Sequence, residues 1–205
     1  MARRRSARGP GQRLVCVVEG HGEVEAVPAL CSRIRDFLEA WTWFVDPDPV
    51  RQPRSRLVDQ GVPSPRRPAP GDGLRRAVEL AAVRADAVLV LCDADDDCPA
   101  VWGPSATAVV TARCSGGAVM VVREYEAWLL HSKIGATDAR GRPVDSIRDA
   151  RGALRSLIPG YKSTTHQAHL TRRIPIEGLR ASSASFDKLV RTLARIFGVN
   201  APPIR

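Results

Sequence analysis

Four aspartates follow an uninterrupted apolar stretch near the middle of the chain. The stretch, residues 87–92, is short, aliphatic and β-branched, which is typical of a strand buried on both faces in a parallel sheet. Carboxylates crowded together repel one another unless a cation or a shared proton lies between them. The segment therefore predicts a divalent metal site; the alternative is that the acids cap the helix that opens at Cys98–Pro99. The acids are Asp93, Asp95, Asp96 and Asp97.

An Asp-x-Asp-x-Asp run also begins the calcium loop of an EF-hand. That loop requires Gly at its sixth position and Glu at its twelfth. This chain has Cys98 and Pro104 at those positions, so the sequence excludes an EF-hand.

Two further buried-strand patterns, residues 13–18 and 118–122, also end in acids. Parallel strands joined by right-handed crossovers place their carboxyl ends on one edge of the sheet, and that edge is where open α/β sheets bind ligands. We therefore expect the acids of all three segments to converge, among them Glu19, Asp93 and Asp95. The acids that follow the two further patterns are Glu19 and Glu23 after the first, and Glu124 and Glu126 after the second.

Hydrophobic periodicity predicts the elements that must position these acids. The fold class expected is α/β, a mainly parallel, Rossmann-like sheet flanked by helices, with a helical C-terminal part. Residues 41–73 are rich in Pro and Arg, which favours a loop, with a short strand near 44–50. Gly103–Pro104 is expected to kink one helical segment or divide it in two. Helices are predicted over residues 23–40, 73–84, 99–112, 146–157 and 162–173, and from a cap at Ser185 to residue 197.

Length and composition favour one main core. A chain of 205 residues with 44% hydrophobic and 26% charged residues is typical of a globular protein. We expect residues 1–12 to form a disordered basic tail, 13–132 an α/β core and 133–205 a helical extension packed on that core. No apolar run approaches 18 residues, so no membrane partner is expected. The five cysteines show no Cys-x-x-Cys spacing, which predicts reduced thiols. The first residues lack the apolar region of a secretory signal, so a cytoplasmic location is expected.

The net charge of +9 permits an acidic polymer as partner. Five of these charges are arginines within the first 13 residues, so the remaining chain carries +4 (9 minus 5). Candidates for phosphate contacts are His21, Lys162, Arg172 and Arg173, and the alternative for each is a turn residue or a solvated helix face. Nucleic acid is thus the expected partner, and homo-oligomerisation is left open.

The candidate metal ligands are carboxylate oxygens, with no pair of Cys or His side chains among them. Such a ligand set indicates a hard cation, Mg²⁺ or Mn²⁺. A metal ion of this kind lowers the pKa of a bound water and stabilises charge on an attacked phosphate, so the hypothesis is phosphodiester hydrolysis. The catalytic residues expected are Glu19, Asp93 and Asp95, and these also bind the metal. Further metal ligands or orienting groups are expected at Glu23, Asp97 and Glu126.

Residues 18–23 followed by residues 91–95 resemble the Toprim fold, in which a Glu after the first strand and an Asp-x-Asp after a later one bind magnesium. Over residues 13–197 the chain is similar to a bacterial family of unknown function, DUF4276. The resemblance implies a relative of the overcoming-lysogenization-defect nucleases that acts beside an ATPase in phage defence, and it offers Glu19 as a general acid or base. No Gly-x-x-x-x-Gly-Lys-Ser/Thr motif is present, so nucleotide hydrolysis would belong to a partner. The motifs that carry the family resemblance are residues 19–23, 92–97 and 123–128, Tyr161–Lys162 with Gln167, and Ser185–Phe186.

Two alternatives remain open at this point. A phosphotransferase or phosphatase of the haloacid dehalogenase kind also uses Asp-x-Asp after a strand, but normally after the first strand and followed by Thr or Val, whereas here Asp96 follows. A non-enzymatic protein, in which the acidic edge holds a structural cation or binds a partner within a larger complex, is the second.

Overall fold

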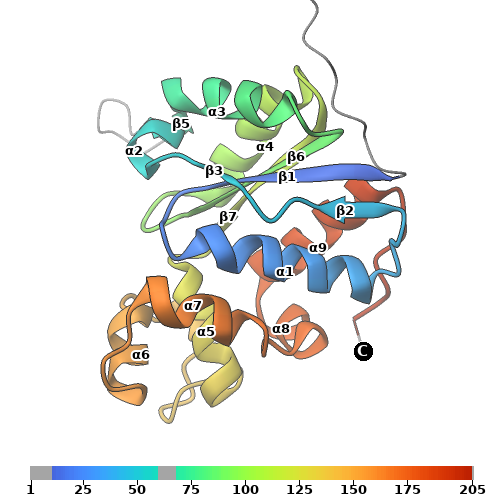
Figure 1. Cartoon of the computed structure of the whole chain (residues 1–205). Helices are drawn as coiled ribbons and strands as arrows, with labels where there is room; N and C mark the ends of the chain where they lie inside the picture. Colours follow the sequence, from blue (N-terminus) through green and yellow to red (C-terminus); the bar gives the residue numbers. More distant parts are fainter. Residues whose placement is uncertain (1–10, 60–67, 205) are drawn as a thin grey trace, which may run out of the picture.

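The computed structural model describes residues 11–59 and 68–204 (Figure 1). Most of the basic tail expected over residues 1–12 lies outside the described residues, as do residues 60–67 of the Pro- and Arg-rich segment. Gln12 is a correction to that boundary, because it is the first residue of β1 and its backbone N–H donates to the Thr42 carbonyl at 3.0 Å.

A parallel sheet forms the centre of the molecule. Its strand order is β2-β1-β6-β7, and β3 also pairs with β1. All these pairings are parallel, so the carboxyl ends of the strands lie on one side, the left of Figure 1. The α/β architecture with a mostly parallel sheet flanked by helices is thereby confirmed. The strands are β1 (Gln12–Val18), β2 (Trp43–Val45), β3 (Val50–Arg51), β6 (Ala87–Asp93) and β7 (Ser115–Val121), with a separate antiparallel pair β4 (Val58–Asp59) and β5 (Ala69–Pro70).

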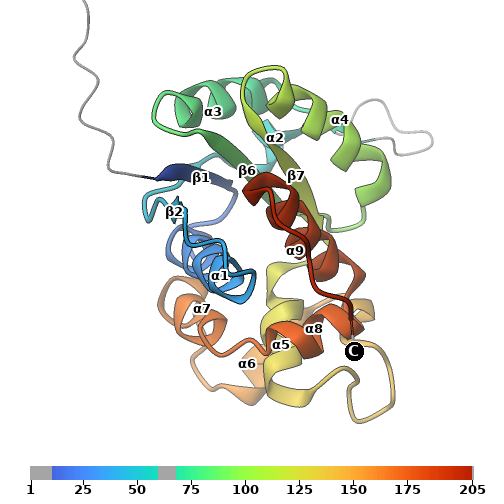
Figure 2. The same ribbon diagram turned by 90° about the vertical axis from the view of Figure 1, so that its right-hand side faces the viewer.

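Helices cover both faces of the sheet, as Figures 1 and 2 show. Leu89 and Leu91 of β6 pack in the cluster that includes α1 and α9, whereas Val88 and Val90 pack in the cluster under α3 and α4. Because neighbouring residues of a strand point to opposite faces, a strand covered on both faces must be apolar at every position. The helices are α1 (Glu23–Phe37), α2 (Arg54–Leu57), α3 (Asp72–Ala82), α4 (Pro99–Thr111), α5 (Tyr125–Ile134), α6 (Ala150–Leu157), α7 (Ser163–Thr171), α8 (Ile176–Ser182) and α9 (Ala184–Phe197), with a 3₁₀ turn η1 (Val144–Ser146).

Of the two alternatives for the segment with Gly103–Pro104, a kinked helix or two short ones, the structure excludes the second. Helix α4 is a single helix, since Pro104 removes only the hydrogen bond to the carbonyl four residues earlier. The cap predicted at Ser185 was wrong. The cap of α9 is Ser183 and not Ser185, because the Ser183 hydroxyl accepts from the Phe186 N–H at 3.3 Å. Ser185 instead accepts from the indole N–H of Trp128 at 3.3 Å.

The elements after residue 133 pack against the sheet and its helices. Helix α7 lies against α1, and α9 lies against β7 (Figure 2). Leu170 of α7 and Leu193 of α9 belong to the same hydrophobic cluster as Leu89 of β6. The described part of the C-terminal segment therefore shares its core with the sheet. No helix in residues 11–59 or 68–204 is both long and apolar enough to cross a membrane.

Candidate functional site

Acidic side chains from three adjacent strands meet at the carboxyl edge of the sheet. Glu19 follows β1, Asp93 is the last residue of β6, and Glu126 lies in the first turn of α5, just after β7. Glu23 is the first residue of α1, which starts after the tight turn that leaves β1. We call Glu19, Glu23, Asp93 and Glu126 the carboxylate cluster. Of the acids expected to converge, the structure brings together Glu19, Asp93 and Glu126, with Glu23 beside them, whereas the expected Asp95 pairs with Arg54.

Backbone N–H groups hold three of the four carboxylates in place. Oε2 of Glu19 accepts from the Asp93 N–H at 3.1 Å, which ties β1 to β6. Oε2 of Glu23 accepts from the N–H groups of Glu19 at 3.0 Å and Gly20 at 3.3 Å. Oδ1 of Asp93 accepts from the Tyr125 N–H at 2.8 Å. Each carboxylate is thus fixed through one of its two oxygens.

Glu126 is held by side chains of the C-terminal segment. Its Oε1 accepts from Nε of Arg151 at 3.0 Å, from the Ser163 hydroxyl at 2.9 Å and from the Tyr161 hydroxyl at 3.3 Å. The side chain is fully buried, and its Oε2 has no hydrogen-bond partner. Oε1 of Gln167, on α7, is a second buried oxygen without a partner. Buried polar atoms of this kind are uncommon in folded proteins, so these two oxygens are candidates to contact a bound group.

The second oxygen of every cluster carboxylate is unengaged by the described residues. No hydrogen bond within residues 11–59 and 68–204 reaches Oε1 of Glu19, Oε1 of Glu23, Oδ2 of Asp93 or Oε2 of Glu126. The cluster therefore presents one held and one open oxygen per side chain.

Burial and mutual repulsion make the cluster hard to ionise. Burial, and next the neighbouring Glu19, raise the pKa of Glu23 from its ordinary 4.5 to about 7. Burial, and next Glu23, raise the pKa of Asp93 well above its usual range, and burial also raises the pKa of Glu19. A proton or a cation relieves such repulsion.

Asp95 and Asp97 face a different partner, Arg54 of α2. Nε of Arg54 lies 3.1 Å from Oδ2 of Asp95, and Nη2 of Arg54 contacts Oδ2 of Asp97. Arg54 also donates to the backbone carbonyls of Asp93 at 3.1 Å and Ala94 at 3.0 Å. Arg54 thus engages both acids, and the charge of Asp95 adds to the effect of burial in raising the pKa of Glu19. The structure thus directs Asp97 to Arg54 instead of bringing it into the carboxylate cluster.

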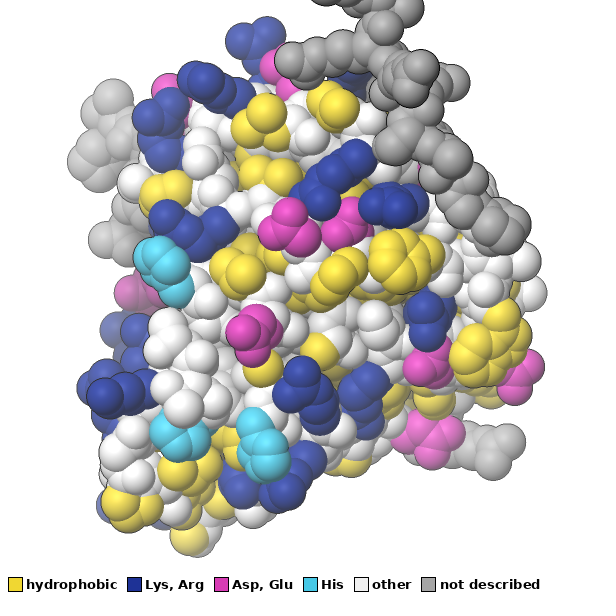
Figure 3. All heavy atoms as spheres, in the orientation of Figure 1, with side chains coloured by type: hydrophobic (Ala, Val, Ile, Leu, Met, Phe, Trp, Pro, Cys, Tyr) yellow, Lys and Arg dark blue, Asp and Glu magenta, His cyan; other side chains and the backbone are white. Residues whose placement is uncertain are grey.

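Basic side chains surround the buried acids. Arg123 and Arg148 lie 3.1 Å and 2.7 Å from Oδ1 of Asp96, and Arg148 remains 73% exposed. Along the left side of Figure 3, on the carboxyl edge of the sheet, Lys, Arg and His side chains gather at the surface with few acids among them. The site is therefore a buried acidic cluster with a basic rim.

The predicted phosphate-binding residues divide into two pairs. His21 is exposed in the turn between β1 and α1, and Lys162 is exposed directly before α7, next to Ser163. Arg172 and Arg173 are exposed at the other end of α7, roughly 13 Å from its start at about 1.5 Å per residue. The structure brings the first pair beside the cluster and leaves the second pair away from it.

Sequence reasoning gives no role to Arg151 and Ser163, and it treats Arg54 only as one of several arginines that either contact a phosphate backbone or lie in a solvated loop. Arg54 stands in the Pro- and Arg-rich segment, where no periodicity marks it. Arg151 and Ser163 reach Glu126 from helices 25 and 37 positions away in sequence. Tyr161 and Gln167 stood out only through the family resemblance.

The donor set fits a hard divalent cation in its chemistry. It is made of carboxylate oxygens, as Mg²⁺ and Mn²⁺ prefer, and the partnerless Oε2 of Glu126 lies among them. No three or more His, Cys, Asp or Glu side chains in the described residues are, however, arranged to hold a metal ion as they stand. The side chains would have to close around an ion.

Comparison with known proteins gave no match of this chain to a family model, a curated protein or a solved structure.

Proposed function

We propose that this protein is a Mg²⁺- or Mn²⁺-dependent phosphodiesterase of Toprim-like architecture that acts on nucleic acid. The observation that carries the proposal is the carboxylate cluster, in which four acids are each held through one oxygen and offer the other. The basic rim supports a phosphate-containing substrate, because cations at the mouth of the site attract the phosphate backbone. An ATPase partner in phage defence rests on the family resemblance alone.

Glu19, Asp93 and Asp95 are the residues proposed to hold the cation, with Glu23 and Glu126 as further ligands. When bound, the ion supplies a water of lowered pKa and stabilises the charge on the attacked phosphate. Asp95 must turn from Arg54 to join this set, while Arg54 keeps its contacts with Asp97 and with the carbonyls of Asp93 and Ala94.

The chain's own groups supply the remaining functions. Arg123, Arg148 and Lys162 lie at the rim, where they can orient a phosphate by charge. Burial raises the pKa of the Glu19 carboxyl above its ordinary value, a shift that suits a general acid or base. Arg151 fixes Glu126 by a charge-assisted hydrogen bond.

Metal binding provides the first test. MgCl₂ and MnCl₂ are titrated by calorimetry into the full chain freed of metal with EDTA, with Asp93→Asn as the test variant. Asp96→Asn is the matched control, since Asp96 lies on the same loop but pairs with rim arginines. We expect affinity to fall at least tenfold in Asp93→Asn and to be kept in Asp96→Asn. Absence of binding to the wild type would refute the metal-dependent proposal.

Cleavage provides the second test. Supercoiled DNA, linear duplex DNA and structured RNA are incubated with Mg²⁺ or Mn²⁺ and the wild type, Glu19→Gln, Asp93→Asn or Asp96→Asn. Metal-dependent cleavage that is lost in the first two variants and kept in the third is expected. Equal cleavage by Asp93→Asn would show that another nuclease is responsible.

A non-enzymatic metal- or partner-binding subunit is the second candidate function. It is supported by the open oxygens of the carboxylate cluster, which suit a structural cation or the donor groups of a partner as well as a catalytic ion. Metal binding that depends on Asp93, without cleavage of any of the three substrates, would support this candidate over the nuclease. A phosphatase or phosphotransferase is tested in the same reactions with a phosphomonoester.

A further inference from the structure

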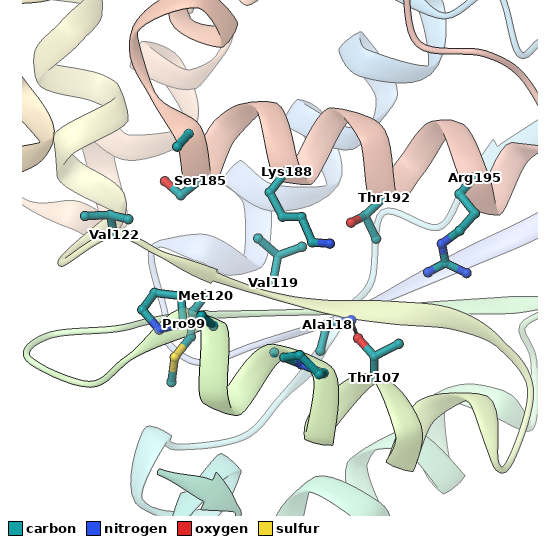
Figure 4. A pocket seen from close by; sticks show the side chains of 14 residues that line it. Pro99, Thr107, Ala118, Val119, Met120, Val122, Ser185, Lys188, Thr192 and Arg195 are labelled. Atoms are coloured by element: carbon teal, nitrogen blue, oxygen red, sulfur yellow. Dashed lines mark hydrogen bonds between the residues drawn. The ribbon is translucent and has the colours of Figure 1, made fainter. Parts of the chain in front are cut away.

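A groove runs along the free edge of the sheet, away from the carboxylate cluster. Strand β7 is the last in the order β2-β1-β6-β7, so one of its edges has no neighbouring strand among the described residues. Helices α4 and α9 stand on either side of this edge and enclose a groove of about 730 Å³ (Figure 4).

Small residues form the walls of the groove where they meet the strand. Gly103 and Pro104 of α4 line one wall, and Ser185 of α9 lines the other. A Cβ added at Gly103 would meet nothing nearer than the Ala118 carbonyl oxygen at 3.9 Å. Space therefore extends from α4 to the backbone of β7.

Side chains protect only the first part of the strand edge. In a parallel strand, the N–H and C=O of alternate residues point to the same side, and here Gly116, Ala118 and Met120 face the groove. The Gly116 carbonyl accepts from Nη2 of Arg195 at 2.9 Å, and the Ala118 N–H donates to the Thr107 hydroxyl at 3.0 Å.

The rest of the edge is open. No hydrogen bond from a described residue reaches the Ala118 carbonyl or the N–H and C=O of Met120. Unpaired backbone groups on a strand edge are a template for another strand, and proteins usually cover them. Here they lie at the floor of the groove.

The groove is also positively charged. Lys188 of α9 projects into it in Figure 4 and has no acidic partner among the described residues. Arg195 stands further along the same helix, bound to the strand backbone. An occupant with an acidic group beside apolar groups would complement both the charge and the walls.

We propose that this groove binds an extended segment of a partner protein, with an acidic side chain among apolar ones, which adds to β7 as a further strand. An added strand lies about 4.8 Å from its neighbour, and the groove of about 730 Å³ lies along that edge of β7. The edge of a second copy carries its own flanking helices and would meet α4 and α9 first. The open stretch, from the Ala118 carbonyl to the Met120 carbonyl, would pair with about three residues, or roughly 10 Å of extended chain.

One end of the groove lies beside the loop that carries Asp95, Asp96 and Asp97. Pro99 and Val122 line the groove and also a smaller hollow of about 230 Å³ formed with Asp95, Asp96 and Asp97. A strand docked on β7 would end beside this loop. The proposal does not depend on the proposed nuclease activity, since it rests only on the strand edge, the groove and Lys188.

The test is selection of a random ten-residue peptide library on the immobilised full chain, followed by anisotropy measurements with the selected peptides. Gly103→Leu fills the groove without a clash at Cβ, and Lys188→Glu reverses its charge. Lys133→Glu, an exposed lysine on α5, is the control. We expect enriched peptides to carry Asp or Glu among apolar residues, to bind at least tenfold more weakly to both groove variants, and to bind Lys133→Glu normally. Methylation of the backbone nitrogen that faces Met120 should abolish binding.

Other outcomes would overturn the proposal. Enriched peptides that bind Gly103→Leu as well as the wild type would place their site elsewhere. A dimer in sedimentation that Gly103→Leu disrupts would show that a second copy fills the groove. If no peptide is enriched, and if dodecanoate binds to the wild type but not to Lys188→Glu, the groove is a site for a small amphipathic acid and not for a strand.

Discussion

Replacing Glu23 by Gln should stabilise the metal-free protein, and increasingly so as the pH rises. Glu23 is buried in the carboxylate cluster, where burial and Glu19 raise its pKa to about 7. Glutamine has nearly the same shape and keeps an oxygen to accept the N–H groups of Glu19 and Gly20. The substitution therefore removes the titration and preserves the hydrogen bonds.

The magnitude follows from the difference between the folded and unfolded pKa of Glu23. A carboxyl whose pKa rises on folding favours the folded state at low pH, and this contribution is lost as the pH rises from 4.5 through about 7. At about 1.4 kcal/mol per pKa unit, the loss amounts to ~3 kcal/mol. Glu23→Gln should thus match the wild type at pH 4 and exceed its free energy of unfolding by up to about 3 kcal/mol at pH 8.5.

Urea unfolding in EDTA, followed by circular dichroism between pH 4 and pH 8.5, measures this difference. Glu25→Gln is the matched control, because Glu25 is exposed on the same helix, and it should show no such trend. If Glu23→Gln is no more stable than the wild type at pH 8.5, burial and the neighbouring carboxylates do not raise the pKa of Glu23 as described. Added Mg²⁺ should narrow the difference if the ion binds the ionised cluster.

Three further predictions concern single contacts. Gly22→Ala places a Cβ 2.0 Å from Oε1 of Gln167, so we expect a loss of about 1–3 kcal/mol in the free energy of unfolding by urea, and an unchanged midpoint would contradict that packing. Arg54→Met removes the ion pair with the buried Asp97 and should cost about 1–3 kcal/mol at pH 7; calorimetric unfolding that matches the wild type would mean that the pair adds nothing. Ser183→Ala removes the cap of α9 and should cost about 1 kcal/mol in the same measurement, whereas no loss would show that the hydroxyl does not cap the helix.

Much of the fold could be predicted because the informative residues are contiguous. The six residues before Asp93 are all apolar. A strand needs apolar side chains at every position when both faces of its sheet are covered. The periodicity after Glu23 marks α1 in the same way. Since three such strands each end in acids, their meeting at one edge followed from topology.

The parts that could not be predicted depend on contacts between distant segments. Arg54 acquires its role only because α2 returns to the loop of Asp95 and Asp97. Helix α8 is one of the short elements and carries no strong pattern of its own, so its residues were not assigned to a helix. The cap of α9 was misplaced by two residues because Ser183 and Ser185 are equally good caps in sequence, and only the contact with Trp128 distinguishes them.

The burial of Glu126 has a consequence for the order in which the chain folds. Its donors, Arg151, Tyr161 and Ser163, are synthesised after the whole sheet. Until they arrive, a buried carboxylate in α5 would lack partners, which is costly. We therefore expect the first turn of α5 to stay solvated during synthesis and to settle only when α6 and α7 dock. Contacts of such long sequence separation form late and slowly, so the candidate site should be among the last parts of the molecule to mature.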